Sequence, residues 1–335
     1  MSTRPADDPQ PDLDTVLAGL RVVAIPMRVR FRGVTVREAA LVEGPAGWGE
    51  FSPFLEYAPV EASRWLASAV ESAWRGWPEP RRTSVPVNAT VPAVRAEQVP
   101  AVLARFEGCQ TAKVKVAERG QSLADDVCRV AAVRDAMGPQ ARIRVDANGA
   151  WDVDQAVDAL GALTAYRLEY AEQPCASVDE LRELRIRLAR GGIDVPVAAD
   201  ESIRKAVDPL LVAQREAADL IVVKVAPLGG VRRALEIVGE CGLPAVVSSA
   251  LDTSVGMAAG VALAAALPEL PFACGLGTVA LLEGDVSAQP LVPERGQLPV
   301  RRVVADRALV DRWAASQDRR AWWRQRVELC WPAQL

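Results

Sequence analysis

The chain has 335 residues, of which 50% are hydrophobic and 24% are charged, so it is long and apolar enough to bury a large core. Its net charge of -4 excludes the basic field that a nucleic-acid-binding protein needs. Histidine is absent, which excludes imidazole bases and histidine-bound zinc and leaves Lys, Asp, Glu, Tyr or Cys for proton transfer.

The first 18 residues are polar and acidic and contain prolines, so we expect a flexible tail over 1–18. They lack the basic end and apolar centre of a secretion signal, which favours a cytoplasmic protein. The most apolar stretch, 255–267, has 13 residues and is too short to cross a bilayer, so it is expected to be a buried helix. No membrane partner is therefore expected.

Residues 19–80 form a small predicted α+β region. Three stretches within 19–53 have the alternation of antiparallel strands, and a helical segment with Trp65 and Trp74 follows them. Residues 81–278 then repeat one theme, a short β-branched or apolar run followed by an amphipathic segment of helical length. The eight runs start 25 to 31 residues apart, at Val85, Thr111, Arg142, Leu168, Val195, Leu220, Ala245 and Phe272.

Strand and helix units at this spacing predict right-handed parallel crossovers, and eight of them close into a (β/α)8 TIM barrel. A solenoid is the alternative, but its repeats share a consensus that these units lack. Ser122 and Gly138 mark the predicted ends of one helix, and Gly229 and Gly230 precede another.

Residues 279–335 form a predicted C-terminal segment that packs on the rest of the chain through its tryptophans, Trp313, Trp322, Trp323 and Trp331. The six cysteines are far apart and form no CxxC pair, so neither a zinc site nor a disulfide framework is indicated. We interpret them as small core residues.

Ionisable residues stand at the carboxyl ends of the middle runs, where barrel active sites assemble. They are two lysines on one face of the second run, a carboxylate on each of the next three runs, and a lysine on the sixth: Lys113, Lys115, Asp146, Glu172, Asp200 and Lys224. Arg144 and Asn148 share the face of Asp146. Each charge alone is compatible with a structural ion pair, but all of them together favour a site.

The three carboxylates would repel one another in one small volume unless a divalent cation neutralises them. Oxygen ligands favour a hard cation, Mg2+ or Mn2+. The lysines on the second and sixth runs would flank this cation from opposite sides, as proton transfer at a planar intermediate requires.

At these residues the sequence resembles the enolase superfamily, in particular its muconate-lactonizing subgroup. The resemblance covers nearly the whole chain and rests on the segments AKVKV, RVDANGAW, YAEQP, AADES and VVKVAPLGG. It implies a modified TIM barrel of the α/β class over 81–278, with an N-terminal α+β capping domain over 19–80 that the segment 279–335 completes. Its capping loops, here Met27 to Gly33 and Phe51 to Tyr57, would close over the substrate.

The resemblance also implies residue roles. Asp146, Glu172 and Asp200 would bind Mg2+, for which Mn2+ can substitute, and Lys115 would be the acid and base at an enediolate. Lys113 would support the pKa of Lys115, Lys224 would act on the opposite face, and Glu201 would stand behind the metal ligands.

Within the subgroup, the segment SSALDTSVG with Ser248 and Ser249, together with Arg144, resembles enzymes of menaquinone biosynthesis. These enzymes dehydrate 2-succinyl-6-hydroxy-2,4-cyclohexadiene-1-carboxylate to an aromatic product by syn elimination. The same lysines suit an N-succinylamino acid racemase, a cycloisomerase or a dipeptide epimerase, so these activities stay open. A lysine Schiff-base aldolase and a non-catalytic barrel are less favoured. The expected partner is a small carboxylate substrate, and both a monomer and a homo-oligomer fit the sequence.

Overall fold

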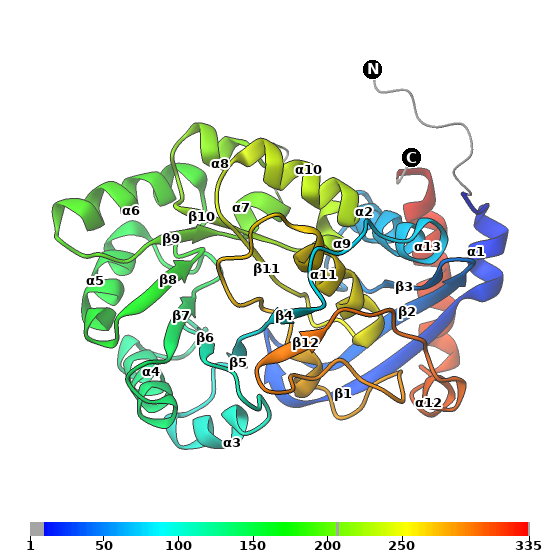
Figure 1. Ribbon diagram of the computed structural model, residues 1–335, viewed down its shortest axis with the longest axis horizontal. Coiled ribbons are helices and arrows are strands. Elements are labelled where there is room, and N and C mark those ends of the chain that lie inside the picture. The colour runs from blue at the N-terminus through cyan, green and yellow to red at the C-terminus, as the bar shows by residue number, and fades with distance from the viewer. Residues whose placement is uncertain (1–9, 206–207, 334–335) are drawn as a thin grey trace.

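The computed structural model describes residues 10–205 and 208–333, and it divides into a barrel and a capping domain that lie side by side (Figure 1). Within these ranges no helix combines the length and the apolar character that crossing a membrane requires.

Seven parallel strands form the curled sheet of the barrel, in the order β11-β10-β9-β8-β7-β6-β5. They are β5 (Ala89–Val91), β6 (Thr111–Lys115), β7 (Arg142–Asp146), β8 (Leu168–Glu172), β9 (Val197–Ala199), β10 (Leu220–Val223) and β11 (Ala245–Val247). The register sets Lys115 beside Asp146 and Asp146 beside Glu172. The predicted order of the charged runs therefore holds around the sheet.

The eighth predicted run closes the ring without forming a regular strand. Cys274 makes a parallel bridge to Val87, and Gly275 makes one to Ser248, so 272–278 joins the two edges of the sheet. An added Cβ at Gly275 would lie 2.5 Å from the hydroxyl oxygen and 3.2 Å from the Cβ of Ser248, so a side chain there would require Ser248 to move. The run from Val85 also divides: β4 (Ser84–Pro86) pairs with β12 (Gln297–Pro299), and only β5 enters the barrel.

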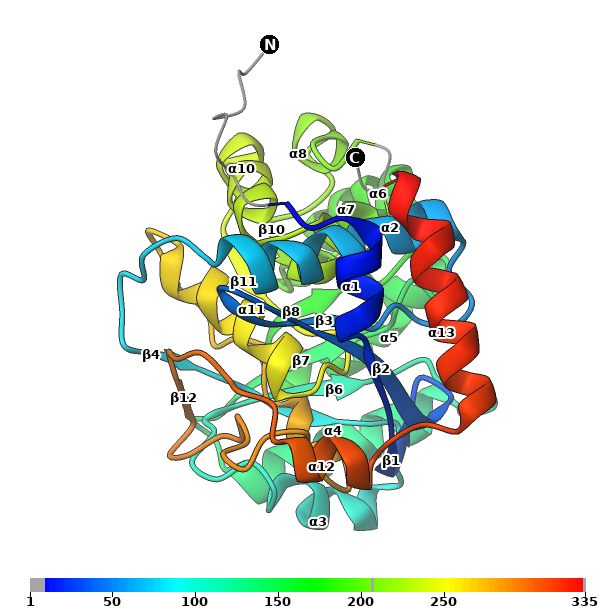
Figure 2. The ribbon, with the colours of Figure 1, turned by 90° about the vertical axis from the view of Figure 1, so that its right-hand side faces the viewer.

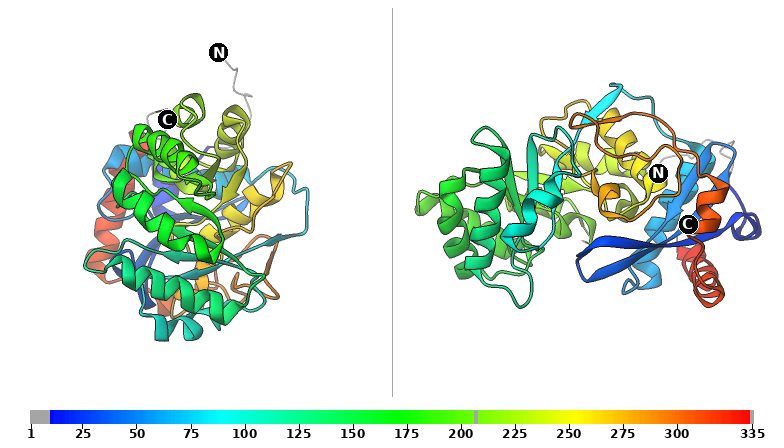
Figure 3. Two further views of the ribbon diagram at one scale, coloured as in Figure 1. Left: turned by 90° about the vertical axis from the view of Figure 1, so that its left-hand side faces the viewer. Right: turned by 90° about the horizontal axis from the view of Figure 1, so that it is seen from below.

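Helices cover the outer face of the sheet (Figure 3, left). The helices of the barrel region are α3 (Val99–Leu103), α4 (Leu123–Met137), α5 (Val153–Leu163), α6 (Val178–Arg190), α7 (Glu201–Arg204), α8 (Leu211–Gln214), α9 (Val225–Leu228), α10 (Val231–Cys241) and α11 (Ser254–Ala266). The side chain of Ser122 accepts from the backbone N–H of Asp125, and Gly138 ends α4, as the sequence predicts. Helix α11 is almost wholly buried, which confirms a core helix at 255–267.

The capping domain is an antiparallel sheet covered by helices. Its strands are β1 (Arg21–Phe31), β2 (Val34–Gly44) and β3 (Gly47–Phe51), and α2 (Pro59–Val70) continues into one π-helical turn, η1 (Glu71–Arg75). The C-terminal helices α12 (Arg307–Arg312) and α13 (Gln317–Cys330) pack on this domain (Figure 2). Trp323 is fully buried and donates from its indole nitrogen to Glu38 at 2.6 Å, which confirms the expected packing of the tail.

Two expectations are corrected by the structure. Residues 13–18 belong to a helix, α1 (Leu13–Gly19), because Asp12 caps its first turn and Val16 and Leu17 bury against the capping domain. The predicted flexible tail over 1–18 is therefore wrong for this part, and residues 1–9 lie outside the described residues. Cys128 is exposed on α4, whereas the other five cysteines are buried.

Replacing glycine by alanine is expected to have opposite effects on stability at two positions. Gly49 on β3 lies against α2, where an added Cβ would stand 2.0 Å from the carbonyl oxygen of Ala69, whereas Gly239 in α10 has open space around it. Gly49→Ala is expected to lower the free energy of unfolding by about 3 kcal/mol through overpacking. Gly239→Ala is expected to raise it by about 0.5–1 kcal/mol through helix propensity. Denaturant unfolding of both variants checks this, and an unchanged midpoint for Gly49→Ala would contradict the close packing.

Candidate active site

The six predicted ionisable residues gather at the carboxyl ends of the barrel strands. Each is at least 92% buried, since their exposed fractions run from 0% to 8%. Strands β7, β8 and β9 lie between β6, which carries Lys113 and Lys115, and β10, which Lys224 follows. The structure thus brings both lysine groups to one cavity from different sides of the barrel.

Each carboxylate accepts a hydrogen bond from a lysine. Lys113 bonds both oxygens of Glu172, at 2.8 and 3.0 Å, and stands 3.4 Å from Asp146. Lys115 donates to Asp146 and to the side-chain oxygen of Asn148, the latter at 2.6 Å. Lys224 donates to Asp200 at 2.5 Å. The negative charges of the buried carboxylates are therefore balanced by the positive charges of the lysines.

The two lysines on β6 have opposite pKa shifts. Burial lowers the pKa of Lys115, and the charges of Lys113 and Arg32 lower it further against the effect of Asp146. Burial alone would lower the pKa of Lys113, but Glu172 and Asp146 raise it above its usual range. Burial also lowers the pKa of Lys224. Lys115 and Lys224 are thus the lysines that can release a proton more readily.

The carboxylates have the chemistry of a divalent-metal site. Burial and, after it, the charge of Asp146 raise the pKa of Glu172 to about 7, as expected for carboxylates that lie close together. As they stand, with each turned to a lysine, no three His, Cys, Asp or Glu side chains within 10–205 and 208–333 are grouped to hold a metal ion. Three buried oxygen donors on neighbouring strand ends nevertheless fit a hard cation.

The cavity above these residues is closed by the capping domain. Phe31 and Arg32, at the tip of the β1–β2 hairpin, and Phe54 from the following loop line it together with the lysines. The hairpin reaches from the capping domain toward the barrel (Figure 3, right). Arg32 stands 5.2 Å over the ring of Phe54, and Lys115 stands 5.3 Å over the ring of Phe31. Both capping loops that the resemblance implies therefore contribute a wall of the cavity.

Hydroxyl groups also line the cavity. Ser248 and Ser249 follow β11, and the hydroxyls of Ser249 and Thr278 stand 2.9 Å apart. Leu251 in the same loop has a φ of 65°, a conformation that a leucine rarely adopts, and Arg37 of β2 holds its carbonyl at 3.0 Å. Arg37 thus ties this loop to the capping domain.

The structure does not bring Arg144 to the cavity. Its side chain is fully buried at the middle of β7, where it donates to Glu169 and, at 2.7 Å, to the carbonyl of Ala273. Its guanidinium lies 4.7 Å over the ring of Tyr170. In this arrangement Arg144 packs in the barrel interior, and its expected place among the substrate-binding or outer residues stays a prediction.

Several residues around Asp200 were not found from the sequence. Gln173 accepts from the backbone N–H groups of Asp200 and Ser202, at 2.9 and 3.1 Å. Arg204 donates to Asp200 at 3.1 Å and to Glu201 at 2.5 Å. The spacing of four residues between Asp200 and Arg204 was the signal for this pair. Glu201 also accepts from Asn148 at 3.1 Å, so the two predicted outer residues do meet.

Glu50 on β3 joins the capping domain to the barrel. Its carboxylate accepts from Ser52 and from the N–H groups of Thr253 and Gly256 at the start of α11. Burial and, after it, the charge of Asp252 raise its pKa from 4.5 to about 7. Between pH 4.5 and about 7, Glu50 therefore binds more protons in the folded protein than in the unfolded protein. Its contribution to the free energy of unfolding is therefore lost as the pH rises through about 7.

We therefore expect a pH-dependent stability difference between wild type and Glu50→Gln. The free energy of unfolding of wild type minus that of the variant should fall as pH rises from about 5.5 to about 8, because ionised Glu50 is disfavoured in the folded state. Urea unfolding at four pH values measures it. A difference that stays constant over this range would contradict the raised pKa.

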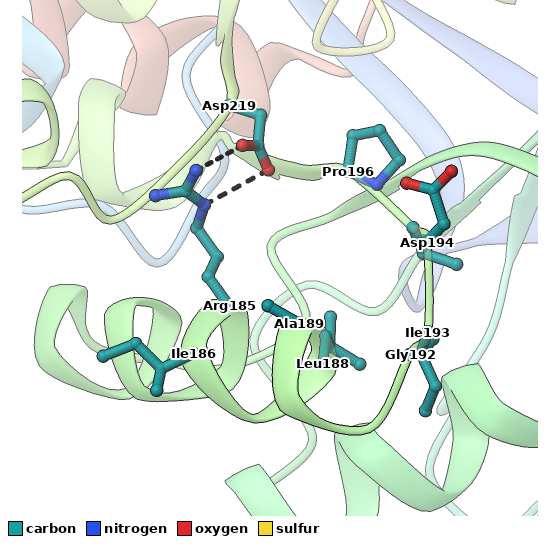
Figure 4. A pocket seen from close by; sticks show the side chains of 10 residues that line it. Arg185, Ile186, Leu188, Ala189, Gly192, Ile193, Asp194, Pro196 and Asp219 are labelled. Atoms are coloured by element: carbon teal, nitrogen blue, oxygen red, sulfur yellow. Dashed lines mark hydrogen bonds and ion pairs between the residues drawn. The ribbon is translucent and has the colours of Figure 1, made fainter.

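A second groove, of about 640 Å3, lies at the opposite ends of the strands (Figure 4). Pro196 and Asp219, which precede β9 and β10, line it with residues of α6. Arg185 and Asp219 bond each other there (Figure 4). This groove lies away from the carboxylates and lysines, so it is not the candidate active site.

Comparisons with known proteins match both domains. The family model described as enolase C-terminal domain-like matches residues 95–303, and the one described as enolase N-terminal domain-like matches 22–73. An o-succinylbenzoate synthase of Thermobifida fusca is 64% identical over 84% of this chain and 87% of its own length. One of Mycolicibacterium smegmatis is 60% identical over 96% and 97%, respectively. One of Mycobacterium tuberculosis is 58% identical over 96% of each chain.

Solved structures share the fold at low identity. The muconate lactonizing enzyme of Pseudomonas fluorescens, complexed with muconolactone, has a TM-score of 0.74 at 21% identity, over 88% of this chain and 98% of that one. The N-succinyl Arg/Lys racemase of Bacillus cereus has a TM-score of 0.73 at 18% identity, over 89% and 97%. These likenesses establish the modified TIM barrel with its capping domain.

Proposed function

The chain belongs to the enolase superfamily, and from its relatives we infer that it is a carbon–oxygen lyase with o-succinylbenzoate synthase activity. Its reaction is the syn dehydration of 2-succinyl-6-hydroxy-2,4-cyclohexadiene-1-carboxylate to 2-succinylbenzoate, a step of menaquinone biosynthesis. The identity of 58–64% with synthases over most of the chain carries this conclusion.

Asp146, Glu172 and Asp200 are the residues that would hold a divalent cation, and we propose Mg2+ with Mn2+ as a substitute. When bound, the cation supplies positive charge that neutralises the substrate carboxylate and stabilises the enediolate. The lysines that bond these carboxylates in the structure would then turn toward the substrate. All three lysines line the cavity, which supports their proposed turn toward the substrate.

Lys115 is the proposed base. Its lowered pKa favours the neutral amine, which takes the proton from C1, next to the substrate carboxylate. The electrons of that C–H bond first enter the enediolate and then form the new C1–C6 double bond as the C6–O bond breaks. The leaving hydroxide takes the proton back from the Lys115 ammonium and departs as water, so one lysine serves both steps on one face of the ring.

Lys224 enters the cavity from the other side of the barrel and is proposed to stabilise the negative charge of the enediolate, with no proton transfer of its own. Phe31, Arg32 and Phe54 cover the cavity and exclude water from the reacting ring. Ser248 and Ser249, which line the cavity, are proposed to donate hydrogen bonds to the succinyl arm.

The test follows ultraviolet absorbance for the aromatic product after the cyclohexadiene carboxylate and Mg2+ are added to the protein. We expect turnover that EDTA abolishes and that added Mg2+ or Mn2+ restores. Turnover that survives EDTA would contradict the metal assignment. Absence of turnover, together with racemisation of N-succinyl amino acids in optical rotation, would replace the synthase by the racemase.

A further inference from the structure

A buried arginine of the C-terminal helix α13 holds the capping loop 52–58 from behind. Arg326 is 8% exposed, and its guanidinium donates to three carbonyl oxygens of this loop. The distances are 3.0 Å to Phe54, 3.3 Å to Leu55 and 2.7 Å to Tyr57. One buried side chain thus satisfies three backbone acceptors in a segment that belongs to no helix or strand.

The guanidinium is itself fixed by aromatic rings. It stands 4.9 Å from the ring centre of Trp322 and 5.9 Å from that of Trp323. Trp323 packs edge-on against Phe51 at the end of β3, with ring centres 5.6 Å apart. Helix α13 therefore sets the position of Arg326 relative to the capping sheet. Arg326 is 269 residues from Tyr57 in sequence.

The loop that Arg326 holds contacts the candidate active site in two places. Phe54 lines the cavity with Lys115. The hydroxyl of Tyr57 accepts from Arg204 at 2.9 Å, and Arg204 in turn donates to Asp200 at 3.1 Å. The rings of Phe54 and Tyr57 also contact each other, with centres 5.7 Å apart. A shift of the loop backbone would therefore move the cavity wall and loosen a partner of Asp200.

We propose that Arg326 is a positioning residue for the substrate cavity, which holds Phe54 and Tyr57 in place through the backbone of the capping loop. Its kinetic consequence rests on the proposed dehydration. Arg326 itself lies outside the cavity lining, so it acts through the loop and not on the substrate.

The experiment compares Arg326→Gln and Arg326→Lys with Arg324→Gln, a control on the same helix whose side chain is 53% exposed. Arg326→Gln is expected to raise KM by about tenfold with a smaller change in kcat, because displacement of a substrate-contacting wall weakens binding and alignment. Arg326→Lys should recover part of this loss, and the control should match wild type. Limited chymotrypsin digestion should cut after Phe54 or Tyr57 faster in Arg326→Gln alone.

A double variant tests whether the effect runs through the loop. In a Phe54→Ala background, Arg326→Gln should raise KM by much less than tenfold, because the wall that it positions is already lost. The proposal is overturned if Arg326→Gln lowers the melting temperature but leaves KM and the digestion rate unchanged, or if the two KM effects multiply fully. If Arg326→Gln does not fold, Arg326→Lys carries the same comparison. Wild-type protein without turnover would refute the proposed function, while the digestion rates would still decide the positioning role.

Discussion

Lys115→Ala is expected to lower kcat for the dehydration by about 1,000-fold or more, since the loss of a positioned acid and base costs 10²–10⁴. Lys115 is the lysine on β6 whose pKa burial lowers, and it lines the cavity beside Phe31. Initial rates of ultraviolet absorbance change, with saturating substrate and Mg2+, measure the effect. KM should change little, because the cation would hold the substrate carboxylate.

Two controls separate this chemistry from loss of structure. Lys115→Arg keeps a positive charge beside Asp146 but cannot become neutral near pH 7, so it should be as inactive as Lys115→Ala. The circular dichroism and melting temperature of the arginine variant should stay close to wild type. Turnover within tenfold of wild type in either variant would show that another group removes the proton.

Glu172→Gln should produce the second large effect, a loss of metal affinity that exceeds the 10- to 100-fold cost of losing an outer partner of a metal ligand. Glu172 stands between Asp146 on β7 and the end of β9, so it is central among the three carboxylates. Isothermal titration of the substrate-free protein with Mg2+ measures the affinity directly. Turnover at fixed low Mg2+ should fall in parallel and recover in part at high Mg2+.

Glu50→Gln is the matched control for this variant. Glu50 is also a buried carboxylic acid with a pKa raised to about 7, but it caps α11 and lies outside the candidate metal ligands. Its substitution should leave the affinity for Mg2+ unchanged. Equal affinity in wild type and Glu172→Gln would remove Glu172 from the proposed ligands.

Local patterns in the sequence determined the barrel strands and the order of the charges on them. The alternation of side chains along a strand puts Lys113 and Lys115 on one face, and parallel strands bring their carboxyl ends to one edge. Helix ends such as Ser122 and Gly138 were likewise predictable, because caps depend on a few neighbouring residues. The resemblance to the enolase superfamily rests on the same residues and is confirmed by both matched domains.

Only the tertiary structure decided which distant segments complete the cavity. The turn of the β1–β2 hairpin brings Arg32 to the cavity, and the side chain of Arg144 pairs with Glu169 in the barrel interior. The hydrogen bond from Arg326 to the carbonyl of Phe54 joins helix α13 to the capping loop. The direction of a strand residue follows from its neighbours in sequence, whereas the partner of a long arginine side chain depends on how separate elements pack, and no local pattern encodes that.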